Sequence, residues 1–373
     1  MGDSHTRSAD VSTGGPGVTT SHARPAGASA SSDVLLDANP GGDAPVPPDQ
    51  RSNGGGLGGG GALPRRKGFG AESAFRTLTL AAGTMVLVII VAITIFLIAR
   101  AVPALRADDA NFLTETVWFA NETPPRFGIA ALAYGTVISA AIALVVAVPI
   151  ALGIALYLSH YAGSRIATTL GFLIDLLAAV PSVVFGLWGL SVFIEPVRDF
   201  SVWLNKYFGW LPLFGGEGPF GRSLMLGGLV LAIMVLPIVT SLSREVFMQT
   251  PTANEEAALA LGATKWEMIR TAVIPYGRPG VIAAVMLGLG RALGETIALA
   301  MTLGFINEIT PNIIKNGGNS IAANIANGFG EAGEIGRGAL IASGLVLFTI
   351  TLIVNMAARA IIYRRREFTE SAA

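Results

Sequence analysis

Two charged residues interrupt a long apolar stretch of the sequence. Between Val281 and Asn307 the only charges are Arg291 and Glu295. A guanidinium group can donate two parallel hydrogen bonds to an oxyanion. A carboxylate four residues later on the same helix face can pair with that guanidinium when no anion is bound. The spacing predicts either a switchable anion contact in a transport pathway or an ion pair that fixes how helices assemble.

Charges in such a stretch are costly if it crosses a membrane. Each charge at the centre of a membrane helix costs roughly 2.5 to 3.5 kcal/mol on insertion scales, so an idle pair is not expected. Gly290 and Gly294 form a small-residue step beside the pair, which predicts a surface where another helix comes close. Ser182, directly after Pro181 in another apolar stretch, is a further candidate contact in the pathway.

The composition indicates a membrane protein. The chain has 373 residues, of which 52% are hydrophobic and 13% charged, and its mean hydropathy is +0.60. Its net charge is zero, and no basic segment with interleaved aromatic residues points to nucleic acid. Cysteine is absent, which excludes disulfides, thiolate nucleophiles and cysteine metal ligands. The three histidines, His5, His22 and His160, are scattered, so we expect neither a metal site nor a catalytic site.

The apolar stretches predict an all-α polytopic membrane protein with six transmembrane helices. Each stretch is long enough, at about 1.5 Å per residue, to cross a hydrocarbon core of roughly 30 Å. All six lie in a predicted transmembrane domain at residues 71–365. The predicted spans are residues 77–99, 128–158, 176–194, 223–242, 280–305 and 338–362.

Two tails flank this predicted domain. Residues 1–70 are rich in Gly, Pro, Ser and Ala with few large apolar side chains, which predicts a disordered tail. Residues 366–373 form a short C-terminal tail. Lys and Arg residues are more numerous near the span ends on the side that carries both termini. The positive-inside rule therefore predicts that both termini are cytoplasmic, which agrees with an even number of spans.

One predicted outer loop is rich in aromatic residues. Trp203, Tyr207, Phe208 and Trp210 lie close together after the third span. Aromatic rings concentrate at the boundary between lipid and water. We expect this segment to lie in the membrane interface as an anchor.

The longest predicted inner loop, residues 250–278, contains signals for two short helices. Thr252 with Glu255 and Thr264 with Glu267 have the spacing of a capping box, in which two side chains satisfy backbone N–H groups at a helix start. Each predicted helix has about ten residues or fewer, below the length at which an isolated helix is stable in water. Packing against another surface must therefore stabilise them.

The sequence also predicts where these two helices end and which side chains the first one exposes. Gly262 is placed to end the first helix and Pro275 to end the second. Ala257, Ala258 and Ala260 give the first helix a face of small side chains. Such a face fits insertion into a groove of a partner protein, but it could equally pack against the inner surface of its own bundle.

The sequence of this loop resembles the EAA signature of ABC importer permeases. The stretch "EAALALG" followed by "AVIP" carries the resemblance and departs from the usual pattern only at Ala272 and Ile274, which remain apolar. The matching residues are Glu256, Ala257, Ala258, Gly262 and Pro275. The resemblance implies that the loop couples to an ATPase subunit by seating in its cleft.

ATP hydrolysis itself is not expected from this chain. A phosphate-binding P-loop needs a Lys followed by Ser or Thr, and none of Lys67, Lys206, Lys265 and Lys315 is so followed. We therefore expect that this chain binds no cofactor, is not an enzyme, and relies on ATP used by a partner subunit.

Three further stretches are similar to phosphate-transport permeases of the PstC type. They are "AAVPSVVFGLWGL", "RALGETIALAMTLG" and "SIAANIANGFGEA". The resemblance implies the permease fold of a type I ABC importer that carries inorganic phosphate across the cytoplasmic membrane. It also implies three partners within the lipid bilayer or at its surfaces: a PstA-like permease, a PstB-like ATPase dimer and an extracytoplasmic phosphate-binding protein.

Several alternatives remain open on the sequence. The same loop would suit an ABC permease for molybdate, sulfate or a polyamine, although a polyamine pathway favours carboxylates over arginine. A secondary transporter or channel without ATP would be supported by inverted repeats, and we find no internal repeat. A membrane-embedded enzyme is a third alternative. The sequence does not support it, because the predicted spans contain no Ser and His pairing, no HExxH motif and no paired aspartates.

Overall fold

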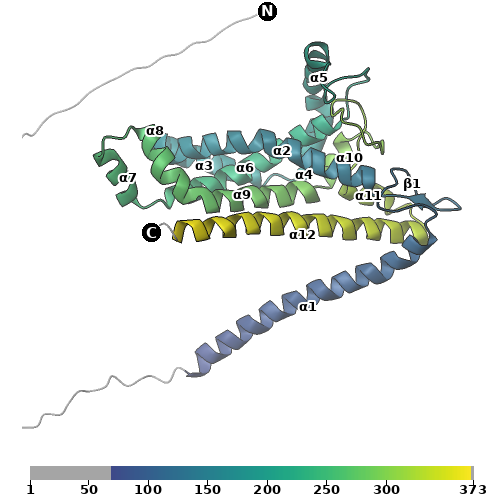
Figure 1. Cartoon of the computed structure of the whole chain (residues 1–373), viewed down its shortest axis with the longest axis horizontal. Helices are drawn as coiled ribbons and strands as arrows, with labels where there is room; N and C mark the ends of the chain where they lie inside the picture. The colour runs from purple at the N-terminus through teal and green to yellow at the C-terminus, as the bar shows by residue number, and fades with distance from the viewer. Residues whose placement is uncertain (1–68, 371–373) are drawn as a thin grey trace, which may run out of the picture. The chain divides into compact units, whose positions relative to one another are not determined.

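The described part of the chain is a helical bundle with one short pair of strands. The structure, a computed structural model, describes the backbone of residues 69–370 and the side chains of residues 73–360. The predicted tail at residues 1–70 lies outside the described residues except for its last two. Figure 1 shows the arrangement of the elements. In chain order they are α1 (Phe69–Ala107), β1 (Trp118–Phe119), β2 (Arg126–Phe127), α2 (Ala130–Leu156), η1 (Tyr157–Tyr161), α3 (Ser164–Ala178), α4 (Ser182–Trp188), η2 (Gly189–Phe193), α5 (Ile194–Phe208), α6 (Leu224–Met248), α7 (Thr252–Ala260), α8 (Lys265–Met268), η3 (Ile269–Val273), α9 (Ile274–Gly294), α10 (Ile297–Thr302), α11 (Ile321–Gly328) and α12 (Glu334–Glu370), where η denotes a π-helix.

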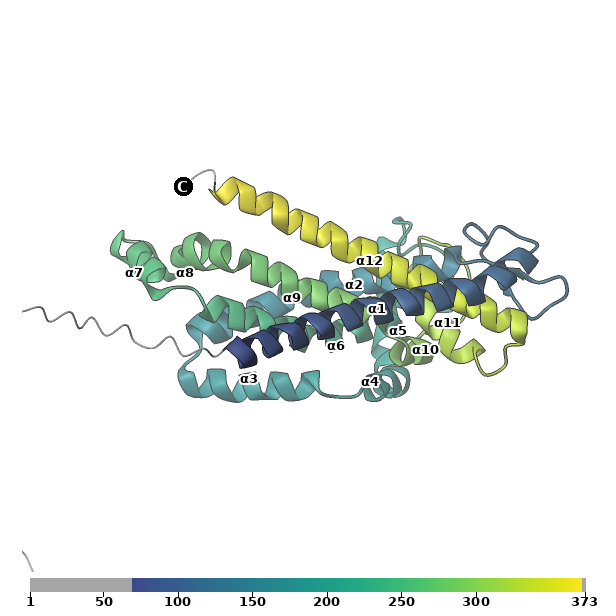
Figure 2. The same cartoon turned by 90° about the horizontal axis from the view of Figure 1, so that it is seen from below.

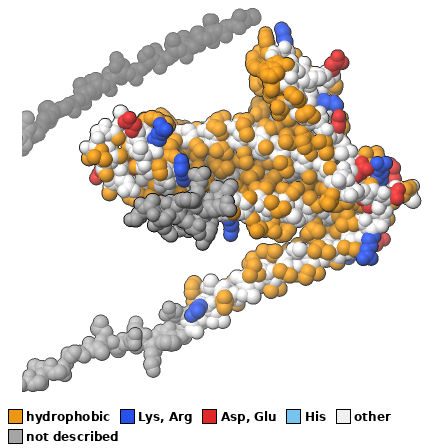
Figure 3. Space-filling view, viewed as in Figure 1, with side chains coloured by type: hydrophobic (Ala, Val, Ile, Leu, Met, Phe, Trp, Pro, Cys, Tyr) orange, Lys and Arg blue, Asp and Glu red, His pale blue; other side chains and the backbone are white. Residues whose placement is uncertain are grey.

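Five helical stretches of the described residues are long and apolar enough to cross a membrane. A bent pair of helices, Ser164–Ala178 with Ser182–Phe208, makes a sixth span if it is counted as one. Figure 3 shows that charged side chains gather mainly toward the ends of the bundle on this face, while its middle is largely apolar. The all-α membrane fold predicted from the sequence is confirmed. The five unbroken stretches are Ser73–Ala107, Ala130–Tyr161, Leu224–Met248, Lys265–Gly294 and Glu334–Ala360.

The predicted third span is wrong as a single helix. Residues 176–194 include a break, because α3 ends at Ala178 and α4 begins at Ser182, with a bend of 88° between the two helical stretches. Pro181 has no backbone N–H and disfavours helical geometry in the residue before it, so a straight helix cannot continue through this point. The bend redirects the chain into α5.

α5 lies nearly at a right angle to the long helices and carries an aromatic face (Figure 1). Phe200 and Trp203 stack with ring centroids 5.8 Å apart. Trp203 also contacts Tyr207 and Phe208, at 5.4 and 5.8 Å between centroids. All four rings are exposed in this chain. Because aromatic side chains favour the lipid–water boundary, this orientation fits the interfacial position expected from the sequence.

The core of the bundle is the seam between α2 and α6. Alanines recur every three or four residues along α2 and therefore lie on one face. Short side chains let the α6 backbone come close, and α6 is the most enclosed of the candidate spans, with 72% of its apolar window buried. The four central alanines of this face, each at most 1% exposed, are Ala140, Ala143, Ala147 and Ala151.

α9 also packs closely against α6, at a glycine that the sequence pattern did not single out. A Cβ atom at Gly288 would lie 2.7 Å from Val235 and 2.9 Å from Val239, so a larger residue would force the helices apart. Cβ atoms at Gly290 and Gly294 would meet no described atom within 4 Å. Within the described residues no helix packs at Gly290 and Gly294, so the predicted close approach of another helix there stays a prediction.

α1 lies at the edge of the bundle. Its Ala101 and Ala104 are buried, and a Cβ atom at Gly338 of α12 would lie 2.7 Å from Ala104. Only 6% of its apolar window is buried. Figures 1 and 2 show α1 close to α12 near its C-terminal end and farther from it near its N-terminal end. Its exposed apolar side chains suit contact with lipid, as expected for a peripheral first span.

A charged contact holds the loop that follows α1. β1 and β2 pair antiparallel, and Arg126 of β2 forms an ion pair with Glu115, with 2.8 Å between Nη2 and Oε2. The hydrogen bond from Arg126, followed by those from the backbone N–H groups of Thr116 and Val117, lowers the pKa of the Glu115 carboxyl. Figures 1 and 2 agree that this loop lies at the end of the bundle opposite α7.

α12 extends beyond the predicted last span. It begins at Glu334 and continues to Glu370, whereas the span was predicted at residues 338–362. The backbone of residues 366–370, predicted as the start of a tail, is therefore helical, and residues 371–373 lie outside the described residues.

Candidate functional site

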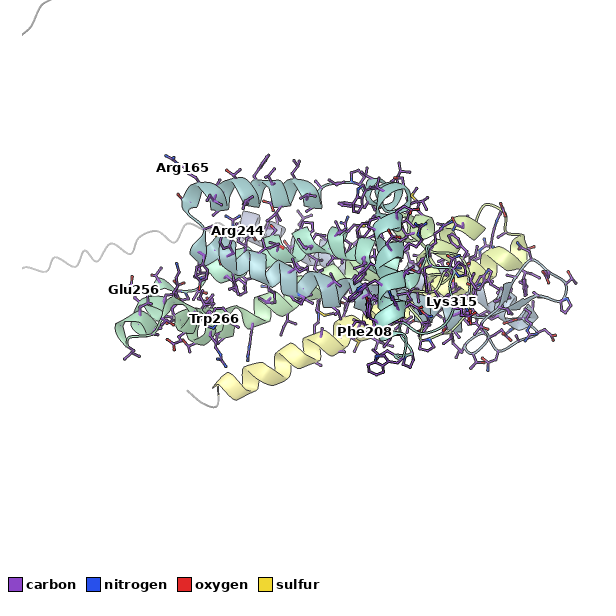
Figure 4. The ribbon with its side chains drawn as sticks, turned by 90° about the horizontal axis from the view of Figure 1, so that it is seen from above. Arg165, Phe208, Arg244, Glu256, Trp266 and Lys315 are labelled. Carbon is purple, nitrogen blue, oxygen red and sulfur yellow. The ribbon has the colours of Figure 1, made fainter. Side chains whose placement is uncertain are left out.

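The loop at residues 250–278 lies at one end of the bundle and leaves α7 exposed. Figure 4 places Glu256 and Trp266 at this end. None of the nine residues of α7 is buried, and the following Leu261 is 90% exposed. A helix this short is unstable alone in water. Its exposed apolar side chains, such as Leu259, are available to contact another molecule.

The start of α7 differs from the sequence prediction. Pro251 occupies the N-cap position and no side chain caps the helix, so the predicted capping box of Thr252 with Glu255 is wrong. Thr252 is instead the first helical residue. The proline ring fixes φ at −59° at the cap, a conformation that leads the chain into the helix without a capping side chain.

Gly262 ends α7, as predicted. Its φ of +84° is a left-handed conformation that favours glycine. The N–H of Gly262 donates to the carbonyl of Leu259 at 2.9 Å, and that of Ala263 donates to Ala258 at 3.2 Å. These two bonds form a Schellman motif, which satisfies the last carbonyls of the helix. A Cβ atom at Gly262 would meet no described atom, so conformation and not space requires glycine here.

The second predicted capping box is confirmed. The Thr264 N–H donates to Glu267 Oε2 at 2.7 Å, and the Glu267 N–H donates to Thr264 Oγ1 at 3.3 Å. The predicted end at Pro275 is wrong, because α8, η3 and α9 form one continuous stretch and Pro275 lies near the start of α9. The preceding π turn bonds the N–H of Ile274 to the carbonyl of Ile269. This turn admits the proline, which has no N–H to contribute.

A small apolar cluster attaches this loop to the bundle. Met268, Ile269 and Val273 are at most 3% exposed and pack with Ala155 of α2 and Phe247 of α6. α7 contributes only the partly buried Ala258 to the cluster. The segment after Gly262 is therefore fixed to the bundle, while most of α7 projects from it.

His160 makes a further contact with α7 that sequence analysis missed. Its Nε2 lies 3.5 Å from Glu255 Oε1, and its Nδ1 lies 2.7 Å from Ser159 Oγ. The His160 side chain is 7% exposed. His160 and Glu255 are far apart in the sequence, so no local pattern could have paired them. In the described part of the chain, no three His, Asp or Glu side chains are grouped so as to hold a metal ion.

The structure separates Arg291 from Glu295. α9 ends at Gly294, and Glu295 has extended backbone angles, so the two residues do not share a helix face as predicted. The ion pairs among residues 73–360 include neither of them. Glu295 is 8% exposed, and its Oε1 accepts a hydrogen bond from the Ala298 N–H at 3.3 Å. The carboxylate therefore caps the start of α10, and the predicted span at residues 280–305 is interrupted.

Arg291 lines a cavity of about 700 Å³ between α6, α9 and α12. Asn355 and Arg359 of α12 supply its other polar lining, and Ile238 of α6 and Leu287 of α9 contribute apolar walls. Sequence analysis missed both α12 residues as site candidates. Their spacing of four residues in an apolar helix was the available signal.

Ser182 lies elsewhere in the structure. It is the first residue of α4, directly after the bend at Pro181, and is not among the residues that line the cavity. Neither does Glu295 line it. Of the three predicted pathway residues, only Arg291 therefore reaches this cavity.

Comparisons with known proteins identify the family of this chain. Residues 147–367 match the family described as binding-protein-dependent transport system inner membrane component. The chain belongs to this family. It is 47% identical over 303 residues to the phosphate transport system permease protein PstC 2 of Mycobacterium tuberculosis, covering 80% of this chain and 93% of that protein. It is 41% identical over 298 residues to PstC of Xylella fastidiosa, covering 79% and 91%. The permease is thus of the PstC type.

One solved structure is similar over a large part of the chain. It is a crystal structure of a bacterial ABC transporter involved in the import of the acidic polysaccharide alginate, with a TM-score of 0.46 and 17% sequence identity. The similarity covers 78% of this permease and 98% of that chain.

Family membership defines the role of the chain at a coarse level. It is a multi-pass membrane permease, a transport subunit of an ABC importer and not itself its catalytic part. The matched residues 147–367 include the exposed α7, Gly262 and the cavity beside Arg291. The candidate functional site of the permease therefore has two parts, the exposed loop at residues 250–278 and the open cavity lined by Arg291, Asn355 and Arg359.

Proposed function

We propose that this permease carries inorganic phosphate across the cytoplasmic membrane into the cell. The main support is the similarity to a phosphate permease at 47% identity over 80% of the chain. In this proposal the chain assembles with a PstA-like permease and two copies of a PstB-like ATPase. An extracytoplasmic binding protein delivers the phosphate.

The exposed inner loop supports coupling to a separate ATPase. Glu256 and Ala257 are exposed on α7, Ala258 is only partly buried, and Gly262 ends the helix in a conformation that few other residues adopt. These residues seat in a cleft of the ATPase, and Pro275 fits the π turn that leads from the loop into α9. Closure of the ATPase on ATP moves the loop and, through this continuous stretch, α9.

The proposal assigns each end of the bundle to one side of the membrane. The end with α7 faces the cytoplasm, where the ATPase is located, and both termini are cytoplasmic. The loop with β1 and β2 lies at the opposite end. That end faces the binding protein.

Arg291 is the proposed anion contact in the pathway. Its guanidinium suits a tetrahedral oxyanion because it can donate two parallel hydrogen bonds, and it lines the cavity within the bundle. Glu295 supports the pathway by capping α10 and not by recapturing the arginine. Ser182, at the start of α4, offers a hydroxyl at the other helix break. The competing role for Arg291 is assembly with the second permease.

The first experiment is uptake of radiolabelled phosphate by phosphate-starved cells with and without this chain, in a strain that lacks other phosphate systems. We expect uptake to require the chain and to resist excess sulfate and molybdate. Competition by either of those anions would point to a permease for another oxyanion. Unchanged uptake without the chain would reject phosphate as the substrate.

A second experiment separates transport from assembly. Arg291→Lys keeps the charge but loses the two-pronged hydrogen bonding. We expect normal recovery of the partner ATPase by affinity purification, together with impaired phosphate uptake. Normal uptake by the Lys variant would reject the forked contact. Transport by the isolated chain without ATP would reject the ABC mechanism as a whole.

A further inference from the structure

The cavity beside Arg291 is lined by a second arginine, Arg359, that the proposed single anion contact does not use. Arg291 of α9 and Arg359 of α12 both line it, and Asn355 lies about one helical turn before Arg359. Ion pairs among residues 73–360 include neither Arg291 nor Arg359. Two guanidinium groups thus share one cavity without a carboxylate of the described residues to balance them.

This arrangement is unfavourable unless an anion joins it. Charged side chains within membrane helices are costly, and they usually pair or mark a substrate path. Arg291 and Arg359 are exposed in this chain, and the cavity walls beside them include apolar side chains such as Met286 and Leu287, which offer neither cation a polar partner. An anion placed between the guanidinium groups would offset the cost of both.

Small residues keep the cavity open. Ala283, Gly290 and Ala358 line it, and a Cβ atom at Gly290 would meet no described atom within 4 Å. A water molecule takes up about 30 Å³ in the liquid. The cavity of about 700 Å³ therefore has room for a tetrahedral oxyanion with part of its hydration shell.

We propose that Arg291, Asn355 and Arg359 form one binding site for a phosphate dianion. Inorganic phosphate, like a phosphate monoester, carries between about one and two negative charges near neutral pH, and two guanidinium groups balance the dianion. Each guanidinium group donates two parallel hydrogen bonds, and the Asn355 amide donates to a remaining oxygen. The inference rests on the proposed function in taking Arg291 as an anion contact, and it adds Asn355 and Arg359 as binding residues.

The test begins with binding to the assembled complex without ATP. The complex is purified through the full-length chain, placed in phosphatidylcholine nanodiscs and titrated with radiolabelled inorganic phosphate. We expect Arg359→Gln to weaken binding by about 10- to 100-fold, the loss typical of a hydrogen bond to a charged group. Arg337→Gln is the matched control, because Arg337 is on the same helix but outside the cavity, and it should bind like the unmodified complex.

Two further variants keep the test decisive if Arg359→Gln fails to assemble. Asn355→Asp preserves size but adds a carboxylate beside the arginines, which should compete with phosphate and weaken binding by at least about tenfold. Gly290→Leu keeps both arginines and fills the space, with the same expected loss. Unchanged phosphate affinity in both variants would overturn the inference.

A parallel arm distinguishes free phosphate from a lipid phosphate group. The complex is also placed in nanodiscs that contain phosphatidic acid, and native mass spectrometry counts the retained lipids. Binding of inorganic phosphate that depends on Arg359 supports the site with free phosphate as its ligand. Retention of phosphatidic acid that depends on Arg359, without binding of inorganic phosphate, supports the site with a lipid ligand. The absence of both overturns it.

Uptake assays separate failure of this inference from failure of the proposed function. If Arg359→Gln transports phosphate with unchanged KM and maximal rate while Arg291→Gln does not, the two-arginine site is wrong and the phosphate permease stands. If the unmodified complex takes up no phosphate, the proposed function fails, whatever the binding result.

Discussion

α2 and α7 both have faces of small alanine side chains, but their surroundings differ. In α2, Ala143 and Ala147 are 0% exposed because α6 packs directly on them. In α7, no residue is buried, and Leu261 directly after it is 90% exposed. Small side chains let two backbones approach closely in both settings. Burial therefore distinguishes a face that completes the fold of the chain from one that remains exposed.

The largest effect that we expect is a loss of stability when a side chain on the buried alanine face of α2 is enlarged. Ala147→Leu adds volume where α2 and α6 are in contact, and overpacking typically costs about 1 to 3 kcal/mol. We expect a lower thermal unfolding midpoint in detergent and less folded protein in the membrane. Val145→Leu is the control, since Val145 is on the same helix but 74% exposed. Equal stability of the two variants would contradict the α2–α6 seam.

The same enlargement on the exposed face should act on function alone. Ala257→Leu on α7 should leave the free energy of unfolding within about 0.5 kcal/mol of that of the unmodified protein, as is usual for surface changes. It should reduce recovery of the ATPase and phosphate uptake by at least about tenfold, because a close contact of small residues is lost. A stability loss without a loss of ATPase binding would mean that α7 packs on its own bundle.

The end of α7 offers a smaller test of the same surface. Gly262 has a φ of +84°, which strongly disfavours a β-branched residue but is tolerated by asparagine. We expect Gly262→Val to impair ATPase binding several-fold and Gly262→Asn to retain most of it, as measured by co-purification. If both variants behave alike, the backbone conformation is not what matters at this position.

The polar contact between α7 and η1 should contribute less. His160 and Glu255 lie 3.5 Å apart between Nε2 and Oε1, and such a contact contributes roughly 0.5 to 1.5 kcal/mol. A double-mutant cycle with His160→Ala and Glu255→Ala, measured on ATPase affinity, should show a coupling energy in this range. Additive effects of the two substitutions would show that the contact does not hold α7 in place.

The loop with β1 and β2, at the other end of the bundle, differs from both α2 and α7 because an ion pair between Arg126 and Glu115 holds it. The pKa of Glu115 is lowered in the folded protein by its hydrogen bond from Arg126. Its stabilising contribution is therefore complete above the ordinary glutamate pKa of about 4.3 and is lost as pH falls through the lower folded value. We expect hydrogen-exchange protection of the Thr116 and Val117 amides to decrease over that range. Glu115→Gln should have lower protection at neutral pH and little dependence on pH.

Local sequence signals predicted the structure of the loop at residues 250–278 well where a backbone requirement was strong. Gly262 and the Thr264–Glu267 box are in the expected positions because each is set by residues within one helical turn. The Thr252 box was wrong because Pro251 occupies the cap position. Of two capping-box patterns, one formed and the other did not, because Pro251 precedes Thr252 and occupies the N-cap position.

The interruptions of the third and fifth predicted spans were missed for a related reason. Hydropathy continues across Pro181 and across Glu295, so a window over residues 176–194 or 280–305 reads as one apolar segment. The structure bends at the first and caps a new helix at the second. Glycine before a carboxylate, as at Gly294, is the local signal that would have identified the second break.

The cavity beside Arg291 could be predicted only in part. Arg291 was identified because a charge in an apolar stretch is visible in the sequence. Asn355 and Arg359 come from a helix far along the chain, and only tertiary packing brings them to the same cavity. Likewise, nothing in the sequence pairs His160 with Glu255.

The π turn η3 has a mechanical consequence for the permease. A π turn contains one residue more than an α turn, and η3 joins α8 directly to α9. If η3 changed to α geometry by passing one residue onward, α9 would rotate by about 100° about its axis and shift by about 1.5 Å along it. A small movement of the loop at residues 250–278 would thereby rotate α9 and change the direction that Arg291 faces.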